Sequence, residues 1–209
     1  MAYRVQTLVN GSMEQNCYLL YDDDRREALV VDPGSQSQRL RQAMDAAGVR
    51  PALIVATHGH FDHVGAVQAL KDAYGVPFGL AQADAGLLDV LVDSAAFYGL
   101  DAGAQPAVER WLEAGELKVA GLDLRILATP GHTPGGLCFY HGASASLFSG
   151  DTLFAGSVGR SDFEGGSHAQ LLDSIRRELL VLPPATKVYP GHGPVSDLAT
   201  EMAQNRFLR

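Results

Sequence analysis

The segment "ALIVATHGHFDHVG", residues 52 to 65, constrains the fold of this chain more than any other part of it. Its first six residues are a continuous run without charge, which is typical of a short strand buried on both faces. His58 and His60 follow two positions apart at the strand end, so their side chains share one face. Asp62 and His63 come where the chain turns into a helix expected to reach Tyr74. One strand end therefore supplies four side chains that can bind a metal.

Three more residues of the same kind occur at similar places, namely His132 in "TPGHTPG", Asp151 in "FSGDTLF" and His192 in "YPGHGP". Each one follows or ends a predicted strand and is surrounded by Gly or Pro, which suits a loop held in a fixed shape. Burying so many unpaired ionisable groups together would cost more than ~2 kcal/mol for each of them. Because a bound metal removes that cost, we expect a metal site. His141 and His168 are expected to lie outside it.

Imidazole and carboxylate ligands without a thiolate suit Zn²⁺, Fe²⁺ or Mn²⁺. Since each ion takes about four to six ligands, the seven residues can hold two ions with one carboxylate between them. Such a pair lowers the pKa of a shared water and stabilises the tetrahedral alkoxide that forms after attack. The residues alone thus predict a metal-dependent hydrolase acting on an ester, thioester, lactam or phosphoester.

The remaining sequence alternates blocks of strands with helices. Strands are expected at 3–9, 16–22, 27–32 and 76–81, and helices from Ser35, with Gln38 completing a capping box, and over 83–98. Residues 100–116 are expected to form a long surface connection. In the second half we expect strands at 116–121, 122–129, 135–141, 145–151 and 187–193, and helices from a Ser167–Gln170 capping box and over 196–208.

This order of elements predicts an α+β fold in which two sheets pack on each other with helices outside. No linker divides the halves, so residues 1–209 are expected to form one domain. The net charge of -8, without a cluster of Lys and Arg, argues against nucleic-acid and membrane surfaces and favours a small-molecule substrate. Cys17 and Cys138 lie in apolar segments far apart, and no signal peptide is evident, which favours the cytoplasm. Nothing in the sequence defines an oligomeric state.

The motifs "THGHFDH", "GHT", "GD" and "GHG", in this order, resemble the metallo-β-lactamase superfamily. The resemblance implies a four-layer αββα sandwich with the site at one edge of the two sheets, and a hydroxide between the ions as nucleophile, with Asp62 and Asp151 as catalytic residues. Asp32 in "VVDPG" is implied to support the site from behind. The resemblance also implies two ion sites, formed by His58, His60 and His132 and by Asp62, His63 and His192, with Asp151 as the bridge.

Within the superfamily, the stretch from Asp151 through "GRSDFEGGS" (159–167) is similar to the short bacterial glyoxalase II, or hydroxyacylglutathione hydrolase, group. This similarity implies hydrolysis of S-2-hydroxyacylglutathione thioesters with two Zn²⁺ ions, although Fe²⁺ or Mn²⁺ suits the same ligands. The helical C-terminal domain of full-length glyoxalase II is expected to be absent, because 17 residues follow His192. Zinc β-lactamases of the commonest kind carry Cys where this chain has Asp151, so penicillin hydrolysis is disfavoured.

Arg160 stands where glyoxalase II carries a basic residue that touches the thiol carrier. We therefore expect it to bind a substrate carboxylate, with an internal ion pair to Asp162 as the alternative. Persulfide dioxygenases are the main alternative function, since they share the fold, the histidine motif and a similar loop. They use one Fe²⁺ held by the equivalents of His58, His132 and Asp151. A lactonase or another esterase of the superfamily is a weaker alternative.

Overall fold

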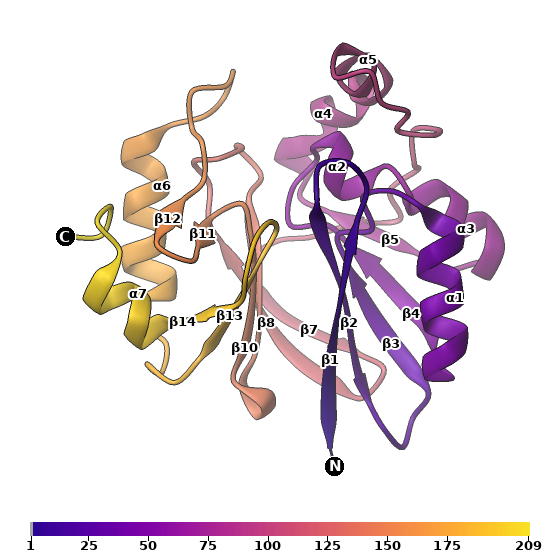
Figure 1. Cartoon of the computed structure of the whole chain (residues 1–209), viewed down its shortest axis with the longest axis horizontal. Helices are drawn as coiled ribbons and strands as arrows, with labels where there is room; N and C mark the ends of the chain where they lie inside the picture. Colours follow the sequence, from indigo (N-terminus) through magenta and orange to yellow (C-terminus); the bar gives the residue numbers. More distant parts are fainter. Residues whose placement is uncertain (1) are drawn as a thin grey trace.

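The computed structural model describes residues 2–209, and two mixed sheets of six strands each dominate it (Figure 1). In the first sheet the strands follow chain order, antiparallel from β1 to β3 and parallel from β3 to β6. Its strands are β1 (Tyr3–Asn10), β2 (Gln15–Asp22), β3 (Glu27–Val31), β4 (Arg50–Val55), β5 (Phe78–Leu80) and β6 (Arg110–Trp111).

The second sheet has the order β14-β13-β10-β9-β8-β7, and only its β10–β13 pair is parallel. A separate two-stranded hairpin, β11 with β12, follows β10. The bounds are β7 (Gly115–Val119), β8 (Leu122–Ala128), β9 (Leu137–His141), β10 (Ser146–Gly150), β11 (Leu153–Phe154), β12 (Ser157–Val158), β13 (Lys187–Pro190) and β14 (Ser196–Asp197).

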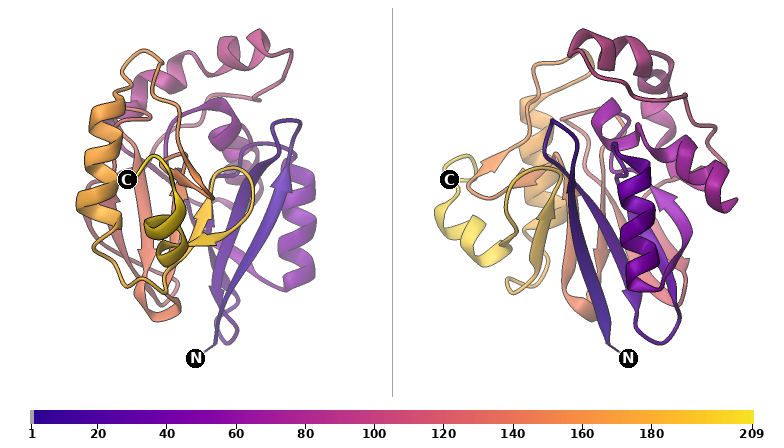
Figure 2. Two further views of the ribbon diagram at one scale, coloured as in Figure 1. Left: turned by 60° about the vertical axis from the view of Figure 1, so that its left-hand side comes forward. Right: turned by 45° about the vertical axis from the view of Figure 1, so that its right-hand side comes forward.

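Helices cover the outer faces of both sheets (Figure 2). Helices α1 (Ser37–Ala47) and α3 (Val67–Tyr74) lie outside the first sheet, and α6 (His168–Ser174), continued by the π-helix η3 (Ile175–Leu179), lies outside the second. The other helices are α2 (Phe61–Val64), η1 (Gln82–Asp84), α4 (Ala85–Asp89), α5 (Leu91–Phe97), η2 (Gly142–Ser144) and α7 (Leu198–Gln204). No helix within residues 2–209 is long and apolar enough to cross a membrane.

Alternating side chains build three apolar cores from the two sheets. Along β2, Leu19 packs against the helices outside the first sheet, whereas Tyr18 and Leu20 face the second sheet. On β9, Phe139 meets them in the central core and Cys138 points outward to α6 and η3. This two-residue period is what a strand buried on both faces requires. The predicted four-layer αββα sandwich is thereby confirmed.

Some local predictions were wrong. Ser35 does not cap α1, because the helix begins at Ser37 and Gln36 takes the N-cap position in a left-handed conformation, while the Ser35 hydroxyl donates to Asn10 Oδ1 over 3.2 Å. The region 83–98 is divided among η1, α4 and α5, and the predicted surface connection contains the edge strand β6. The helix expected over 196–208 is confined to α7. At the other predicted cap, Ser167 Oγ does accept from the backbone N–H of Gln170 at 3.3 Å.

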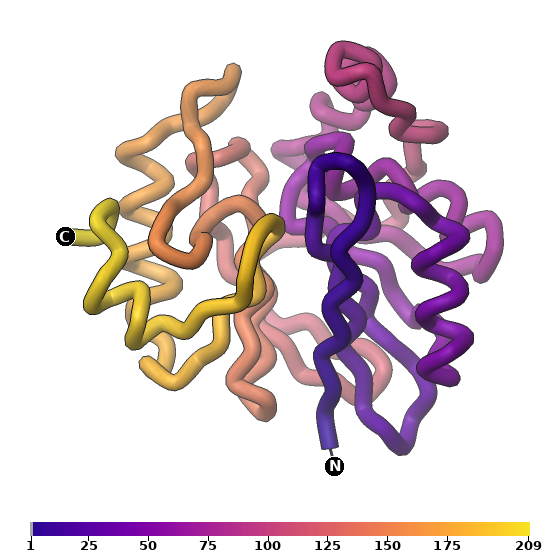
Figure 3. Tube along the Cα trace, in the orientation of Figure 1, coloured from indigo at the N-terminus to yellow at the C-terminus, as the bar shows by residue number. Residues whose placement is uncertain are grey.

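The loops after β4, β8, β10 and β13 meet at one edge of the two sheets. The turn between β1 and β2 runs beside the loop that follows β13 (Figure 3). There the backbone N–H of Asn16 donates to the carbonyl of Gly191 over 2.7 Å, and Asn16 Nδ2 donates to the carbonyls of Pro190 and Gly193. These bonds join the first sheet to the second at the edge where the candidate site lies.

Candidate metal centre

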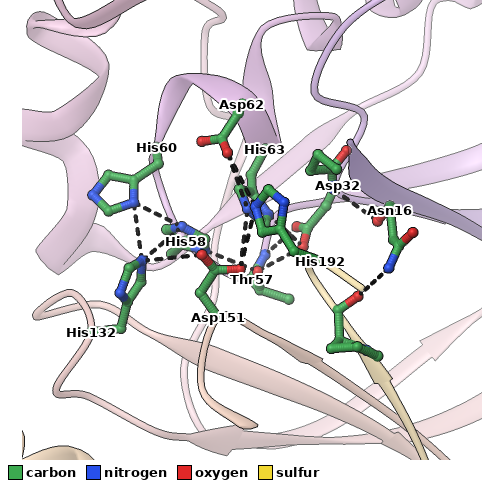
Figure 4. A network of polar contacts seen from close by, with 12 residues as sticks. Asn16, Asp32, Thr57, His58, His60, Asp62, His63, His132, Asp151 and His192 are labelled. Atoms are coloured by element: carbon green, nitrogen blue, oxygen red, sulfur yellow. Dashed lines mark hydrogen bonds and ion pairs between the residues drawn. The ribbon is translucent and has the colours of Figure 1, made fainter. Parts of the chain in front are cut away.

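The structure brings all seven predicted residues together at this edge (Figure 4). The loop after β4 and the start of α2 supply four of them, and the loops after β8, β10 and β13 supply one each. Their ligand-type atoms form three overlapping groups within 4.8 Å. The groups are His58, His60 and His132; His58, His63 and Asp151; and Asp62, His63 and His192.

The first cluster consists of His58, His60 and His132. Nε2 of His58 lies 3.0 Å from Nδ1 of His60, and Nε2 of His132 lies 3.3 and 3.1 Å from these two atoms. Oδ2 of Asp151 lies 3.6 Å from His132 Nε2. Ligands bound tetrahedrally at ~2.0–2.1 Å are about 3.3 Å apart, so these spacings suit one divalent ion.

The second cluster consists of Asp62, His63 and His192. Nε2 of His192 is 3.2 Å from Oδ2 of Asp62, and Nε2 of His63 is 3.9 Å from the same oxygen. The other oxygen of Asp151, Oδ1, lies 3.4 Å from His63 Nε2 and 3.8 Å from His192 Nε2. The two oxygens of Asp151 therefore face different clusters.

Acceptors behind the rings determine which ring nitrogen carries the proton. Nδ1 of His132 lies 2.6 Å from the carbonyl of Arg160, and Nδ1 of His192 lies 3.0 Å from the carbonyl of Met13. Because a carbonyl can only accept, Nδ1 must donate in both residues. A neutral ring then leaves the lone pair of Nε2 directed at the cluster, which is the form that binds a metal.

Asp32 likewise fixes the position of the ring proton in one histidine of each cluster. Its carboxylate accepts from Nδ1 of His63 at 3.0 Å, from the Thr57 N–H at 2.6 Å and from the Thr57 hydroxyl at 2.7 Å. Since the Thr57 hydroxyl has used its proton, it accepts from Nδ1 of His58 at 3.1 Å. Asp32 is 1% exposed. One buried carboxylate thus orients His63 directly and His58 through Thr57.

The nitrogen and oxygen atoms of the two clusters are better arranged to bind metal ions than to hydrogen-bond to one another. His63 Nε2 and Asp151 Oδ1 are buried and have no hydrogen-bond partner in the described part of the chain. The Nε2 atoms of His58 and His132 also face each other as two acceptors. Leaving such groups unpaired is costly, whereas cations placed between them would satisfy every lone pair.

The charge states also suit metal binding. Burial, together with neighbouring histidines, lowers the pKa of His58 well below its usual value and that of His60 to about 4. Burial alone would raise the pKa of Asp62 and Asp151, but His63 lowers both below the ordinary value for a carboxyl group. Near neutral pH His58 and His60 are therefore neutral and both carboxylates are ionised. In the second cluster burial alone would lower the pKa of His63 and His192, but Asp151 and Asp62 respectively raise it above the ordinary value for imidazole.

Asp84 is a residue that sequence reasoning missed. It is fully buried and joins the two loops that carry the first cluster. Its carboxylate accepts from the backbone N–H of Gly59 at 3.0 Å, from the Thr133 hydroxyl at 2.8 Å and from the Gly135 N–H at 2.6 Å. Gly59 separates His58 from His60, so Asp84 holds their loop against the loop of His132. Nothing in "AQADAG" signals this role, because the donors come from distant loops.

A cavity of about 740 Å³ opens over the two clusters, and Arg160 lines it. The guanidinium makes the predicted ion pair with Asp162, 3.0 Å from Nε to Oδ1, and lies 3.9 Å above the ring of Phe163. Its side chain is 62% exposed, so a ligand in the cavity can still reach it. His141 and His168 lie outside the clusters, as expected, and contact Ser144 and Ser161 respectively.

Comparison with known proteins places this fold and site in a family. The sequence profile of the metallo-beta-lactamase superfamily matches residues 11–192. The probable metallo-hydrolase YqgX of Bacillus subtilis is 38% identical over 95% of this chain and 94% of its own. The hydroxyacylglutathione hydrolase GloC of Haemophilus influenzae is 37% identical over 94% of both chains. The chain belongs to the metallo-β-lactamase superfamily, and is a metallo-hydrolase of that superfamily.

Solved structures agree with this assignment. BLEG-1, described as a B3 metallo-beta-lactamase, matches with a TM-score of 0.92 at 36% identity over 98% of this chain and 99% of its own. TTHA1623, crystallised in a di-iron-bound form, matches with a TM-score of 0.89 at 38% identity over 97% and 100%. ETHE1 from Myxococcus xanthus matches with a TM-score of 0.79 at 29% identity over 99% and 84%.

Proposed function

We propose that this metallo-hydrolase cleaves thioesters of the S-2-hydroxyacylglutathione type with two divalent cations. The observation that carries the proposal is the position of Asp151, whose Oδ2 faces the first cluster and whose Oδ1 faces the second. A carboxylate in this position can bridge two ions, and each cluster adds three further ligands. The similarity to GloC, a hydroxyacylglutathione hydrolase, supports the choice of substrate.

In this proposal each residue has a defined part. His58, His60 and His132 would hold one ion, Asp62, His63 and His192 would hold the other, and Asp151 would contribute to both. Bound there, such ions activate a water for attack and stabilise the developing oxyanion. Asp62 and Asp151 both line the cavity, so their carboxylate oxygens can accept hydrogen bonds from the attacking water. Asp32 and Asp84 keep the ligands aligned from behind.

Zinc is the proposed metal, since imidazole and carboxylate donors without a thiolate suit it. The same donors accept Fe²⁺ and Mn²⁺, and the relative TTHA1623 was crystallised in a di-iron form. Arg160 is proposed to pair with a carboxylate of the thiol carrier, because its exposed guanidinium lines the cavity beside the clusters. The buried free thiols of Cys17 and Cys138 are compatible with a cytoplasmic enzyme.

Two observations keep other activities open. The first cluster with Asp151 forms a complete set for one ion, which is what a persulfide dioxygenase with a single Fe²⁺ would need. BLEG-1 is similar over nearly the whole chain and is described as a B3 metallo-beta-lactamase. An Asp at position 151, which differs from the Cys of the commonest β-lactamases, therefore does not by itself exclude penicillin as a substrate. A lactone is cleaved by the same attack of an activated water on a carbonyl carbon, so a lactonase is the weaker alternative.

A substrate panel on the protein as purified tests the proposal. We expect S-D-lactoylglutathione to be hydrolysed faster than a penicillin or a lactone, without oxygen consumption when glutathione persulfide is supplied. Asp151→Ala should abolish turnover, and Asp173→Ala, which changes an exposed carboxylate of α6, is the matched control. Oxygen uptake with the persulfide, or a penicillin cleaved faster than the thioester, would replace the proposed function.

A further inference from the structure

The cavity over the metal clusters has two different walls. Helix α4 supplies Leu87 to one wall, and the end of α5 supplies Phe97 and Tyr98. The loop 159–167 supplies the other wall through Arg160 and Phe163. Figure 1 places α5 and this loop at the same end of the molecule, the end at which β4 and β10 terminate. A substrate whose scissile bond reaches the clusters through this cavity can therefore contact both walls.

The α5 wall is aromatic and open to solvent. Phe97 is 85% exposed and Tyr98 is 51% exposed, although both line the cavity. The ring centroids of Phe97 and Tyr98 are 5.3 Å apart, and that of Phe61 lies 5.5 Å from Tyr98. We call Phe61, Phe97 and Tyr98 the aromatic wall. Connected apolar surface of this kind beside a polar site is typical of a binding pocket.

The orientation of α5 explains why the aromatic wall faces the cavity. Leu91 and Ala95 are buried and anchor the helix, so the positions on its other faces point away from the core. Val92 is 53% exposed but does not line the cavity, whereas Ser94 and Phe97 do. Exposed apolar side chains therefore occur on two faces of α5, and only one of these faces contributes to the cavity.

The charges of the cavity exclude some ligands. Arg160 is the only Lys or Arg among the described residues that line it, and Asp162 already neutralises part of its charge. Asp93 and Glu164 add two carboxylates that belong to neither metal cluster. A carrier with several phosphates would meet one partly paired cation and two repelling groups. A carrier with a single carboxylate to place on Arg160 would meet no such conflict.

We infer that the substrate is a thioester that presents an apolar group to the aromatic wall and at most one carboxylate to Arg160. This inference rests on the proposed thioester hydrolysis and narrows its substrate class. The apolar group can belong to the acyl part or to the thiol carrier, since either end of the thioester can face α5. Carriers with several phosphates, such as coenzyme A, are poor substrates.

Two series of thioesters distinguish an apolar group on the acyl part from one on the thiol carrier. The first varies the acyl group on glutathione from lactoyl to 2-hydroxybutanoyl, 2-hydroxyhexanoyl and mandeloyl. The second keeps lactoyl and varies the carrier among N-acetylcysteamine, hexanethiol, benzyl mercaptan and coenzyme A. In the series that carries the apolar group, we expect kcat/KM to rise by about fourfold for each buried methylene. The coenzyme A thioester should be at least about tenfold slower than that of N-acetylcysteamine.

Variants of α5 test whether Phe97 causes the dependence of kcat/KM on apolar chain length. Phe97→Ala should flatten the dependence on chain length, mainly through KM, whereas Val92→Ala, the matched control on the same helix, should keep the wild-type slope. Equal slopes in both variants, no dependence on apolar length in either series, or efficient cleavage of the coenzyme A thioester would overturn the inference.

A binding measurement separates this inference from the proposed function. Uncleavable S-alkylglutathione and S-alkyl-N-acetylcysteamine thioethers of increasing length are titrated into the metal-loaded protein by calorimetry. Affinity that rises with length in wild type and not in Phe97→Ala supports the aromatic wall even if no thioester is hydrolysed. If thioesters are hydrolysed and thioether affinity is independent of length, the proposed function stands and the inference fails.

Discussion

The Nδ1 atom of His132 donates a hydrogen bond of 2.6 Å to the backbone carbonyl of Arg160. The loop that carries the proposed substrate-binding side chain therefore also orients a residue of the first metal cluster. Phe163 strengthens this link, because its ring packs edge-on against His60 at 5.3 Å and against His132 at 5.6 Å. Changes to side chains of this loop can be separated from changes to its backbone, since the carbonyl of residue 160 remains in any variant.

Replacing Arg160 by Ala should raise KM for S-D-lactoylglutathione by about tenfold and leave kcat within about twofold, since the charged hydrogen bond is lost and the bond to His132 stays. Steady-state kinetics measures both constants. Asp162→Ala is the control, because it frees the guanidinium, and its KM should be equal to or below that of wild type. An unchanged KM in Arg160→Ala would contradict the proposal that Arg160 binds the substrate. The ion pair with Asp162 would then be the function of this residue.

Asp84→Asn should weaken the link between the two loops of the first cluster. An amide has one accepting oxygen where the carboxylate uses two, so at least one of the three donors loses its partner. We expect the free energy of unfolding to fall by about 1–3 kcal/mol, and one metal ion to be lost more readily to a chelator. Asp89→Asn on α4 changes an exposed carboxylate and serves as control. Equal metal retention in the two variants would contradict the positioning role.

Asp32→Asn should affect both clusters, because Asp32 contacts His63 directly and His58 through Thr57. Loss of a partner behind a metal-binding histidine typically lowers metal affinity by about 10- to 100-fold. Competition with a fluorescent zinc chelator measures the affinity of each ion. The prediction fails if both affinities match those of wild type.

Removing metal should destabilise the protein. Without cations, the Nε2 atoms of His58 and His132 face each other, and His63 Nε2 and Asp151 Oδ1 are buried without a hydrogen-bond partner. Ligand at a thousand times its Kd stabilises the folded state by about 4 kcal/mol, so dialysis against a chelator should lower Tm by several degrees. Calorimetry before and after adding zinc back measures this. Identical Tm values for the stripped and reloaded protein would argue against bound metal.

The parts of the site that the sequence predicts are those encoded by local pattern. His58, His60, Asp62 and His63 follow a continuous apolar strand, so the sequence alone predicts their position at a sheet edge. The distant ligands are predictable for the same reason, since each ends or follows a strand. The Ser167 cap of α6 is also local, because it needs only the backbone of Gln170.

The parts that the sequence does not predict depend on contacts across the fold. Asp84 resembles any acidic residue at a helix start until Thr133 and Gly135 are brought to it from about fifty positions away. Ser35 fails as a cap because the chain enters α1 one residue later, at Gln36, and the Ser35 hydroxyl instead contacts Asn10 at the end of β1. The edge strand β6 has two residues, both exposed, so it leaves no hydrophobic pattern to detect.

The number of metal ions bound to each chain tests the central claim most directly. Elemental analysis of the wild type, of His60→Ala and of His192→Ala, each purified after growth with added zinc and iron, gives that number. With a bridging Asp151, the wild type should contain two ions per chain and each variant about one, with thioester turnover only in the wild type. A wild type with a single iron that is kept in both variants would contradict the two-ion account, because the single-iron alternative uses His58, His132 and Asp151.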